Sequence, residues 1–159
     1  HIKYNREERF MESYMEMKER HQREISNFPM QFAFGKEQFE KAMKKLGLSP
    51  EDTDKVCSLY GAGDIMLKDD APKYYALIKR HRKELKDAIA ADATGEFMYG
   101  MFDYELSNYE FGYTQDPTNA LEALGITWGE LNANSQMQKV FAKVCKEQVN
   151  FFNEINGNK

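Results

Sequence analysis

Two histidines in the sequence are each followed, three positions later, by a glutamate: His21 by Glu24, and His81 by Glu84. On a helix this spacing places both side chains on one face, where an imidazole and a carboxylate could bind a metal ion. Helical di-metal proteins use the reverse order, Glu-x-x-His, and here the positions that would carry that glutamate hold lysine and isoleucine. Neighbouring lysines and arginines would also repel a cation. We therefore expect no metal site and no cofactor.

Other common catalytic arrangements are missing. No serine stands in a Gly-x-Ser-x-Gly motif, and neither Cys57 nor Cys145 has a histidine beside it. Each cysteine follows a valine, which indicates buried free thiols. The segment Gly61-Ala62-Gly63 resembles the start of a phosphate loop but lacks the Gly-Lys-Ser/Thr ending, so we interpret it as a tight turn. We assign no catalytic residue.

The most unusual feature is a base-free window, residues 87–138, which contains nine acids and no lysine or arginine. The net charge of the whole chain is only −4, so the rest of the sequence is slightly basic. This asymmetry predicts a negative field over one part of the surface. The window's densest stretch, MFDYELSNYEFGYTQD (101–116), adds aromatic residues, which give rigid contact area to an interface. The candidate partner-binding residues are Glu96, Asp103, Tyr104, Glu105, Glu110 and Asp116.

Two alternatives remain open. The same acids could converge in one pocket and form the active site of a small enzyme, with or without the assistance of a metal. The chain could instead be a regulatory protein that binds DNA through the basic helix expected at 71–91. Direct nucleic-acid binding is disfavoured, because acids are interleaved with the bases of that helix, which are Lys79, Arg80, Arg82, Lys83 and Lys86.

The elements that must position these residues are mostly helices. A first helix is expected from a cap at Asn5 to Pro29, and another is expected to start at Ser49-Pro50. Strands are expected after Pro29 and on both sides of the Gly61-Ala62-Gly63 turn. Further helices are expected over 36–46, from 71 to about 91, from about 94 to 109, over ALEAL (120–124) before Gly125, after a cap at Thr127, and over roughly 135–155. The predicted fold class is α+β, a mostly helical single domain over 1–159 with a small antiparallel sheet.

Apolar stripes at helical spacing predict which faces of these helices are inward. In the segment 101–116 we expect Phe102, Leu106 and Tyr109 in the core and the acids on the outer face. In the last helix we expect an inward stripe that includes Phe151, Phe152 and Ile155 but is interrupted by Gln148. No run approaches the roughly 18 apolar residues that a membrane span needs. The charged N-terminus lacks the apolar stretch of a signal peptide, so we expect a cytoplasmic protein.

Several motifs together resemble an uncharacterised family of small proteins encoded by phages and conjugative elements of gut bacteria. They are QFAFGKEQFEKAMKKLGL (31–48), GAGD (61–64), RHRKEL (80–85) and FDYELSNYEF followed by ALEALGIT (102–127). The usual NHEY of that family is NYEF here, with Tyr109 in place of the histidine, and the usual GAGG ends in Asp64. The resemblance implies an accessory gene of a mobile element and no particular chemistry.

The base-free window and this resemblance together predict a non-enzymatic protein that binds and inhibits a host defence protein, such as a CRISPR effector nuclease. Acids spaced along a folded surface can imitate a row of phosphates and occupy a basic groove. The expected partner is therefore a basic, nucleic-acid-binding host protein. The sequence leaves the oligomeric state open.

Overall fold

The computed structural model describes residues 11–157, so the expectations for Asn5 and the rest of 1–10 lie outside the described residues. The described chain divides into two compact units, each treated separately below. One unit is formed by residues 20–83, and the other by the residues before 20 and after 83. Helices α2 (Tyr14–Ser26) and α4 (Ala71–Ala91) each contribute residues to both units.

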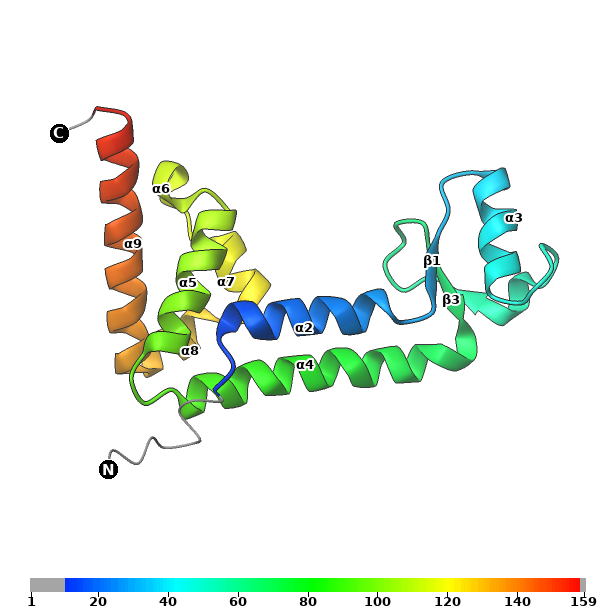
Figure 1. The fold of residues 1–159 in the computed structure, drawn as a ribbon, viewed down its shortest axis with the longest axis horizontal. Helices are drawn as coiled ribbons and strands as arrows, with labels where there is room; N and C mark the ends of the chain where they lie inside the picture. Colours follow the sequence, from blue (N-terminus) through cyan, green and yellow to red (C-terminus); the bar gives the residue numbers. More distant parts are fainter. Residues whose placement is uncertain (1–10, 158–159) are drawn as a thin grey trace, which may run out of the picture. The chain divides into compact units, whose positions relative to one another are not determined.

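The unit of residues 20–83 contains a small antiparallel sheet with strand order β1-β3-β2 (Figure 1). The central strand pairs Met66 with Met30 on one side and with Cys57 on the other. Helix α3 contributes Ala42 and Met43 to a core that also contains Ile65. The elements of this unit are β1 (Met30–Phe32), α3 (Lys36–Lys45), the 3-10 turn η1 (Thr53–Lys55), β2 (Val56–Cys57), β3 (Asp64–Leu67) and the 3-10 turn η2 (Lys68–Asp70), with parts of α2 and α4.

The other unit is helical and is built around α5, beside which α9 runs (Figure 1). Its core is rich in methionine and phenylalanine, with Met98, Met101, Phe102 and Val144 fully buried. Flexible methionine side chains fill the irregular gaps between short helices. The helices are α5 (Glu96–Asn108), α6 (Phe111–Thr114), α7 (Thr118–Leu124), α8 (Trp128–Ala133) and α9 (Ser135–Ile155).

The fold class predicted from the sequence, mostly helical α+β with a small antiparallel sheet, is confirmed. The bounds of α4 and α9 are as predicted, and the Thr127 side chain caps α8 by accepting a hydrogen bond from the Glu130 amide at 3.1 Å. Gly125 ends α7 in the left-handed conformation that glycine adopts readily. None of the helices within 11–157 combines the length and the apolar character that crossing a membrane takes.

Two predicted helices differ from the structure. The first was expected to continue through residues 11–13, but these are not helical, and α2 begins after a capping box in which the side chains of Ser13 and Glu16 each accept a hydrogen bond from the other's amide. At Ser49-Pro50 no α-helix follows, because the Asp52 carboxylate accepts the Ser49 amide and closes a turn instead. The short helix α6 was not predicted at all.

Candidate partner-binding surface

The six candidate residues from the base-free window do not share one environment. Glu96 and Asp103 are exposed on α5, and Glu110 and Asp116 are exposed on either side of α6. Tyr104 is half-buried. Glu105 is only 1% exposed, so the expectation that it faces outward is wrong. Its position next to Leu106 and one turn from Phe102 places it on the inner face of α5.

Glu105 is buried because two groups from α2 satisfy its charge. The Tyr14 hydroxyl donates to Glu105 Oε1 at 2.6 Å, and Lys18 Nζ lies 2.6 Å from the same oxygen. Lys18 also stands 4.8 Å from the centroid of the Tyr104 ring, a cation–π contact. Burial and the bond to Glu105 both raise the pKa of the Tyr14 hydroxyl, which stays protonated and remains a donor. Glu105 and Tyr104 thus hold α5 against α2.

A second acid of the window, Asp92, is also buried and structural. Its carboxylate accepts hydrogen bonds from the amides of Gly95 at 3.0 Å and Met98 at 2.8 Å. These amides at the start of α5 have no partner within the helix, so Asp92 caps it. The remaining seven of the nine acids are exposed: Asp87, Glu96, Asp103, Glu110, Asp116, Glu122 and Glu130.

The window lacks bases in the sequence, but the fold brings bases beside it. Helix α9 packs along α5 and carries three exposed lysines, Lys139, Lys143 and Lys146. Lys143 Nζ stands 5.4 Å from the centroid of the Tyr99 ring on α5. Tyr99 in turn donates a hydrogen bond to Glu147 on α9. The face of α5 that carries Glu96 and Asp103 is therefore bordered by mixed charges, whereas Glu110 and Asp116 lie beyond the end of α5.

An open cleft of about 520 Å³ lies between α6 and the C-terminal part of α9, and sequence reasoning missed it. Phe151 and Ile155, expected in the core, are 64% and 66% exposed and line this cleft. Tyr109, also expected in the core, is 38% exposed. The interruption of the α9 stripe by Gln148 was the available signal, because the exposed Phe151 and Ile155 both follow it. The cleft is lined by Ser107, Glu110, Gly112, Tyr113, Gln148, Phe151, Phe152 and Ile155.

Two polar residues of the cleft are held in defined positions. Gln148 Nε2 donates to the Asp103 carbonyl oxygen at 2.9 Å and approaches its carboxylate at 3.3 Å. Glu110 has left-handed backbone angles, φ 57° and ψ 37°, which are uncommon and strained for a residue with a Cβ. Gln115, after α6, is left-handed too, with φ 54°. These two residues bracket α6 and orient Phe111 inward and Tyr113 outward.

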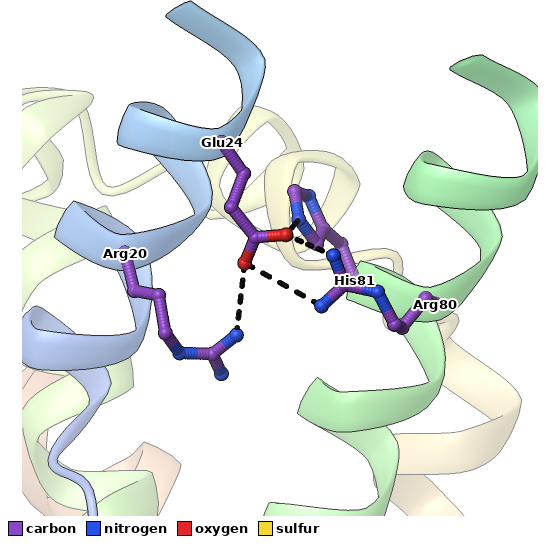
Figure 2. Close-up of polar contacts among 4 residues, drawn as sticks. All are labelled: Arg20, Glu24, Arg80 and His81. Carbon is purple, nitrogen blue, oxygen red and sulfur yellow. Dashed lines mark hydrogen bonds and ion pairs between the residues drawn. The ribbon is translucent and has the colours of Figure 1, made fainter. Parts of the chain in front are cut away.

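The two histidines considered as metal ligands, His21 and His81, belong to a structural cluster in the unit of residues 20–83. The rings of His21 and His81 stack with their centroids 3.7 Å apart. The Glu24 carboxylate points between α2 and α4, with Arg20 Nη1 at 3.1 Å and His81 Nε2 at 3.5 Å (Figure 2). Arg80 donates to the same carboxylate and lowers the pKa of Glu24 to about 2. Guanidinium groups therefore stand beside the Glu24 carboxylate, where a metal ion would otherwise bind.

No group of three or more possible metal ligands occurs among the residues that the structure describes. The glycine turn also offers no phosphate site, because Asp64 occupies its amides. The buried Asp64 carboxylate accepts from the Leu59, Tyr60 and Ala62 amides at 2.7, 3.0 and 3.2 Å. Burial opposes its ionisation, but these hydrogen bonds prevail and lower the pKa of Asp64 to about 2. Gly61 and Gly63 have the positive φ angles that glycine favours, and they lie in the bend that connects β2 to β3.

The chain belongs to a family of unknown function, DUF7659, whose model matches residues 13–147. A search of curated proteins finds no match, and neither does a search of solved structures. The expectation that the chain belongs to an uncharacterised family is thereby confirmed, and the expected phage or conjugative-element origin stays a prediction. The matched region contains all six candidate residues but ends before Gln148, so it leaves out the α9 side of the cleft.

Proposed function

We propose that this protein is a non-enzymatic accessory protein of a mobile genetic element that binds and inhibits a host defence protein, such as a CRISPR effector nuclease. The partner surface consists of the exposed acids Glu96, Asp103, Glu110 and Asp116. It engages arginines and lysines that otherwise hold guide or target nucleic acid. The observation that carries the proposal is the exposure of seven acids within a 52-residue stretch that has no base of its own.

The arrangement of the acids favours binding over catalysis. Catalysis by a carboxylate pair, as in glycoside hydrolysis, needs two carboxylates that converge on one substrate. Here Asp103 is hydrogen-bonded by Gln148, Asp116 caps α7 through the Thr118 amide at 3.0 Å, and Glu105 is closed off inside the protein. Acids that are separated and solvated do not share a proton, but they can each pair with a different base of a partner.

The acid surface also favours a protein partner over DNA. Direct DNA binding would rely on the basic residues of α4, and Arg80 already binds Glu24. Exposed carboxylates repel the phosphate backbone and attract the basic channels of nucleases. The proposal includes a cytoplasmic location for this protein, because such nucleases act in the cytoplasm.

Co-purification with candidate CRISPR effector nucleases, followed by a DNA-cleavage assay, tests the proposal. We expect a stable complex and slower cleavage. Binding should weaken steeply between about 0.1 M and about 1 M salt, because the Debye length falls from about 10 Å to about 3 Å. A panel of nucleases that neither bind the protein nor lose activity would contradict the proposal.

Charge variants test whether the acids are responsible. A triple variant with Glu96→Lys, Asp103→Asn and Asp116→Asn removes charge, and its asparagines still provide oxygen acceptors for Gln148 and Thr118. We expect binding on the order of tenfold weaker, since lost and reversed charges oppose a basic partner. The double variant with Glu40→Lys and Glu51→Lys, at exposed positions of the other unit, changes the net charge by the same amount, is the matched control and should bind normally. Equal loss in both variants would show an effect of net charge alone.

A further inference from the structure

We propose that the cleft between α6 and α9 is a docking site for a segment of a partner protein that carries an aromatic or aliphatic side chain next to lysine or arginine. This inference deepens the proposed function and rests on it, because it adds an apolar anchor to a surface otherwise defined by charge. Interfaces of this kind draw most of their affinity from a few buried anchors, and charge steers the approach.

The first argument is the apolar character of the cleft. Its walls present Tyr113, Phe151 and Ile155 with 71%, 64% and 66% of their surface exposed, and these side chains gather around one hollow. Phe152 supports this wall from behind, with its ring centroid 5.6 Å from that of Tyr113. Contiguous exposed apolar surface is uncommon on a protein that functions alone and marks interaction sites. A volume of about 520 Å³ accommodates a large side chain and its neighbours.

The second argument is the charge of the cleft. Among the described residues that line the cleft, Glu110 is the one acidic side chain, and none is a lysine or an arginine. Gln148 also lines the cleft, and the Asp103 carboxylate lies 3.3 Å from Gln148 Nε2. Two carboxylates beside an apolar hollow complement a positive charge adjacent to an apolar side chain. An acidic or a purely apolar segment would leave Glu110 unpaired on binding, at a cost.

The third argument is the backbone of Glu110. A glutamate with φ 57° is strained, whereas a glycine or asparagine would adopt that conformation readily. The strained residue precedes α6 directly and lines the cleft, and Tyr113 on α6 is exposed. Backbone strain of this kind persists mainly at sites that bind or react.

Titration of the full-length ¹⁵N-labelled protein with synthetic peptides tests the proposal by NMR. The first probe is Gly-Ser-Lys-Phe-Lys-Ser-Gly, and its matched controls replace both lysines by glutamate or the phenylalanine by alanine. We expect saturable shifts at the amides of Glu110, Tyr113 and Phe151, with a dissociation constant on the order of 1 mM or tighter. Both control peptides should bind at least about tenfold more weakly.

Variants of the protein assign the binding to the cleft. Phe151→Ser and Ile155→Ser change exposed side chains and should abolish the shifts while the remaining spectrum keeps its pattern. Glu110→Gln should weaken binding of the lysine peptide but not of the control peptide in which glutamate replaces both lysines. Phe34→Ser is the matched control, because Phe34 is 76% exposed on the other unit of the chain. Shifts that persist in Phe151→Ser, or that the glutamate peptide reproduces, would overturn the proposal.

The other possible occupant of the cleft is a second copy of this chain, and light scattering distinguishes it from a partner segment. A wild-type dimer that Phe151→Ser converts to a monomer would overturn the partner-segment proposal in favour of self-association. The outcomes also separate this inference from the proposed function. If the triple charge variant binds nucleases normally while the peptide still occupies the cleft, the proposed function fails. If the peptide does not bind but the charge variant loses the nuclease, only the cleft proposal fails.

Discussion

Tyr14 donates a hydrogen bond to Glu105, a residue 91 positions later in the chain, across 2.6 Å. Lys18, one turn after Tyr14, meets the same carboxylate oxygen at 2.6 Å. A buried carboxylate is costly unless it is paired and hydrogen-bonded, and here both conditions are met at one oxygen. The other oxygen, Oε2, is buried without a partner among the described residues. The position of α5 relative to the start of α2 thus depends on a small ionic cluster as well as on apolar packing.

Tyr14→Phe should destabilise the protein by about 2 kcal/mol, because it removes a hydrogen bond to a buried charged group and leaves Glu105 with Lys18 alone. Urea denaturation followed by circular dichroism measures the change. Tyr113→Phe removes a hydroxyl from a side chain that is 71% exposed, and it should leave the unfolding free energy unchanged within about 0.5 kcal/mol. Equal stability of Tyr14→Phe and wild type would contradict the structural role assigned to Glu105.

Elements with strong local signals could be predicted from the sequence. Helix α4 begins directly after Asp70, α8 is capped by Thr127, and α7 ends at Gly125, and each of these signals acts within one turn. The pairing of the two strands on either side of Gly61-Ala62-Gly63 could also be predicted, because glycines between two β-rich segments indicate an antiparallel pair. Local chemistry therefore accounts for most of the fold.

The predictions that failed concern residues whose positions depend on contacts with residues far away in the sequence. The inward position of Glu105 could not be predicted, because its partners Tyr14 and Lys18 lie on another helix. Helical periodicity placed Ile155 in the core, but the neighbouring helices do not extend far enough to cover the end of α9. The stacking of His21 on His81 likewise joins two segments that looked like independent basic faces.

Glu110→Gly should stabilise the protein by about 1 kcal/mol, because glycine adopts the left-handed conformation without the strain of a Cβ. Thermal unfolding measures the gain. The same change at Glu122, in the interior of α7, should cost about 1 kcal/mol, because glycine weakens a helix there. A loss of stability in Glu110→Gly would mean that the carboxylate makes a stabilising contact that outweighs its backbone strain.

Gly112→Ala should destabilise the packing of α6 on α9. A Cβ at this position would lie 2.9 Å from the Gln148 carbonyl oxygen and 3.2 Å from Phe152 Cβ, so the two helices must separate. We expect a loss of about 1–3 kcal/mol in the unfolding free energy. Gly100→Ala on α5, where nothing lies within 4 Å of the added Cβ, should instead stabilise by up to about 1 kcal/mol. Opposite signs for these two glycines would support the close approach of α6 and α9.

Acidification should lower the stability of the unit of residues 20–83, because His81 takes up a proton. Burial and the neighbouring His21 lower the pKa of His81, against the opposing effect of Glu24. Because the folded-state pKa is below that of the unfolded chain, the unfolded state binds more protons as the pH falls below about 6.5. The stability contributed by neutral His81 is therefore present above about pH 6.5 and is lost as the pH falls through the lower folded-state pKa.

Urea denaturation at about pH 7 and about pH 5 measures this loss as a lower free energy of unfolding at the lower pH. Glu24 does not contribute to the change in this range, because its pKa is about 2 in the folded protein and its unfolded value is lower than pH 5. His81→Phe keeps an aromatic ring against His21 but cannot take up a proton. That variant should lose less stability than the wild type over the same interval, and an identical pH dependence of the two proteins would assign the effect to other groups.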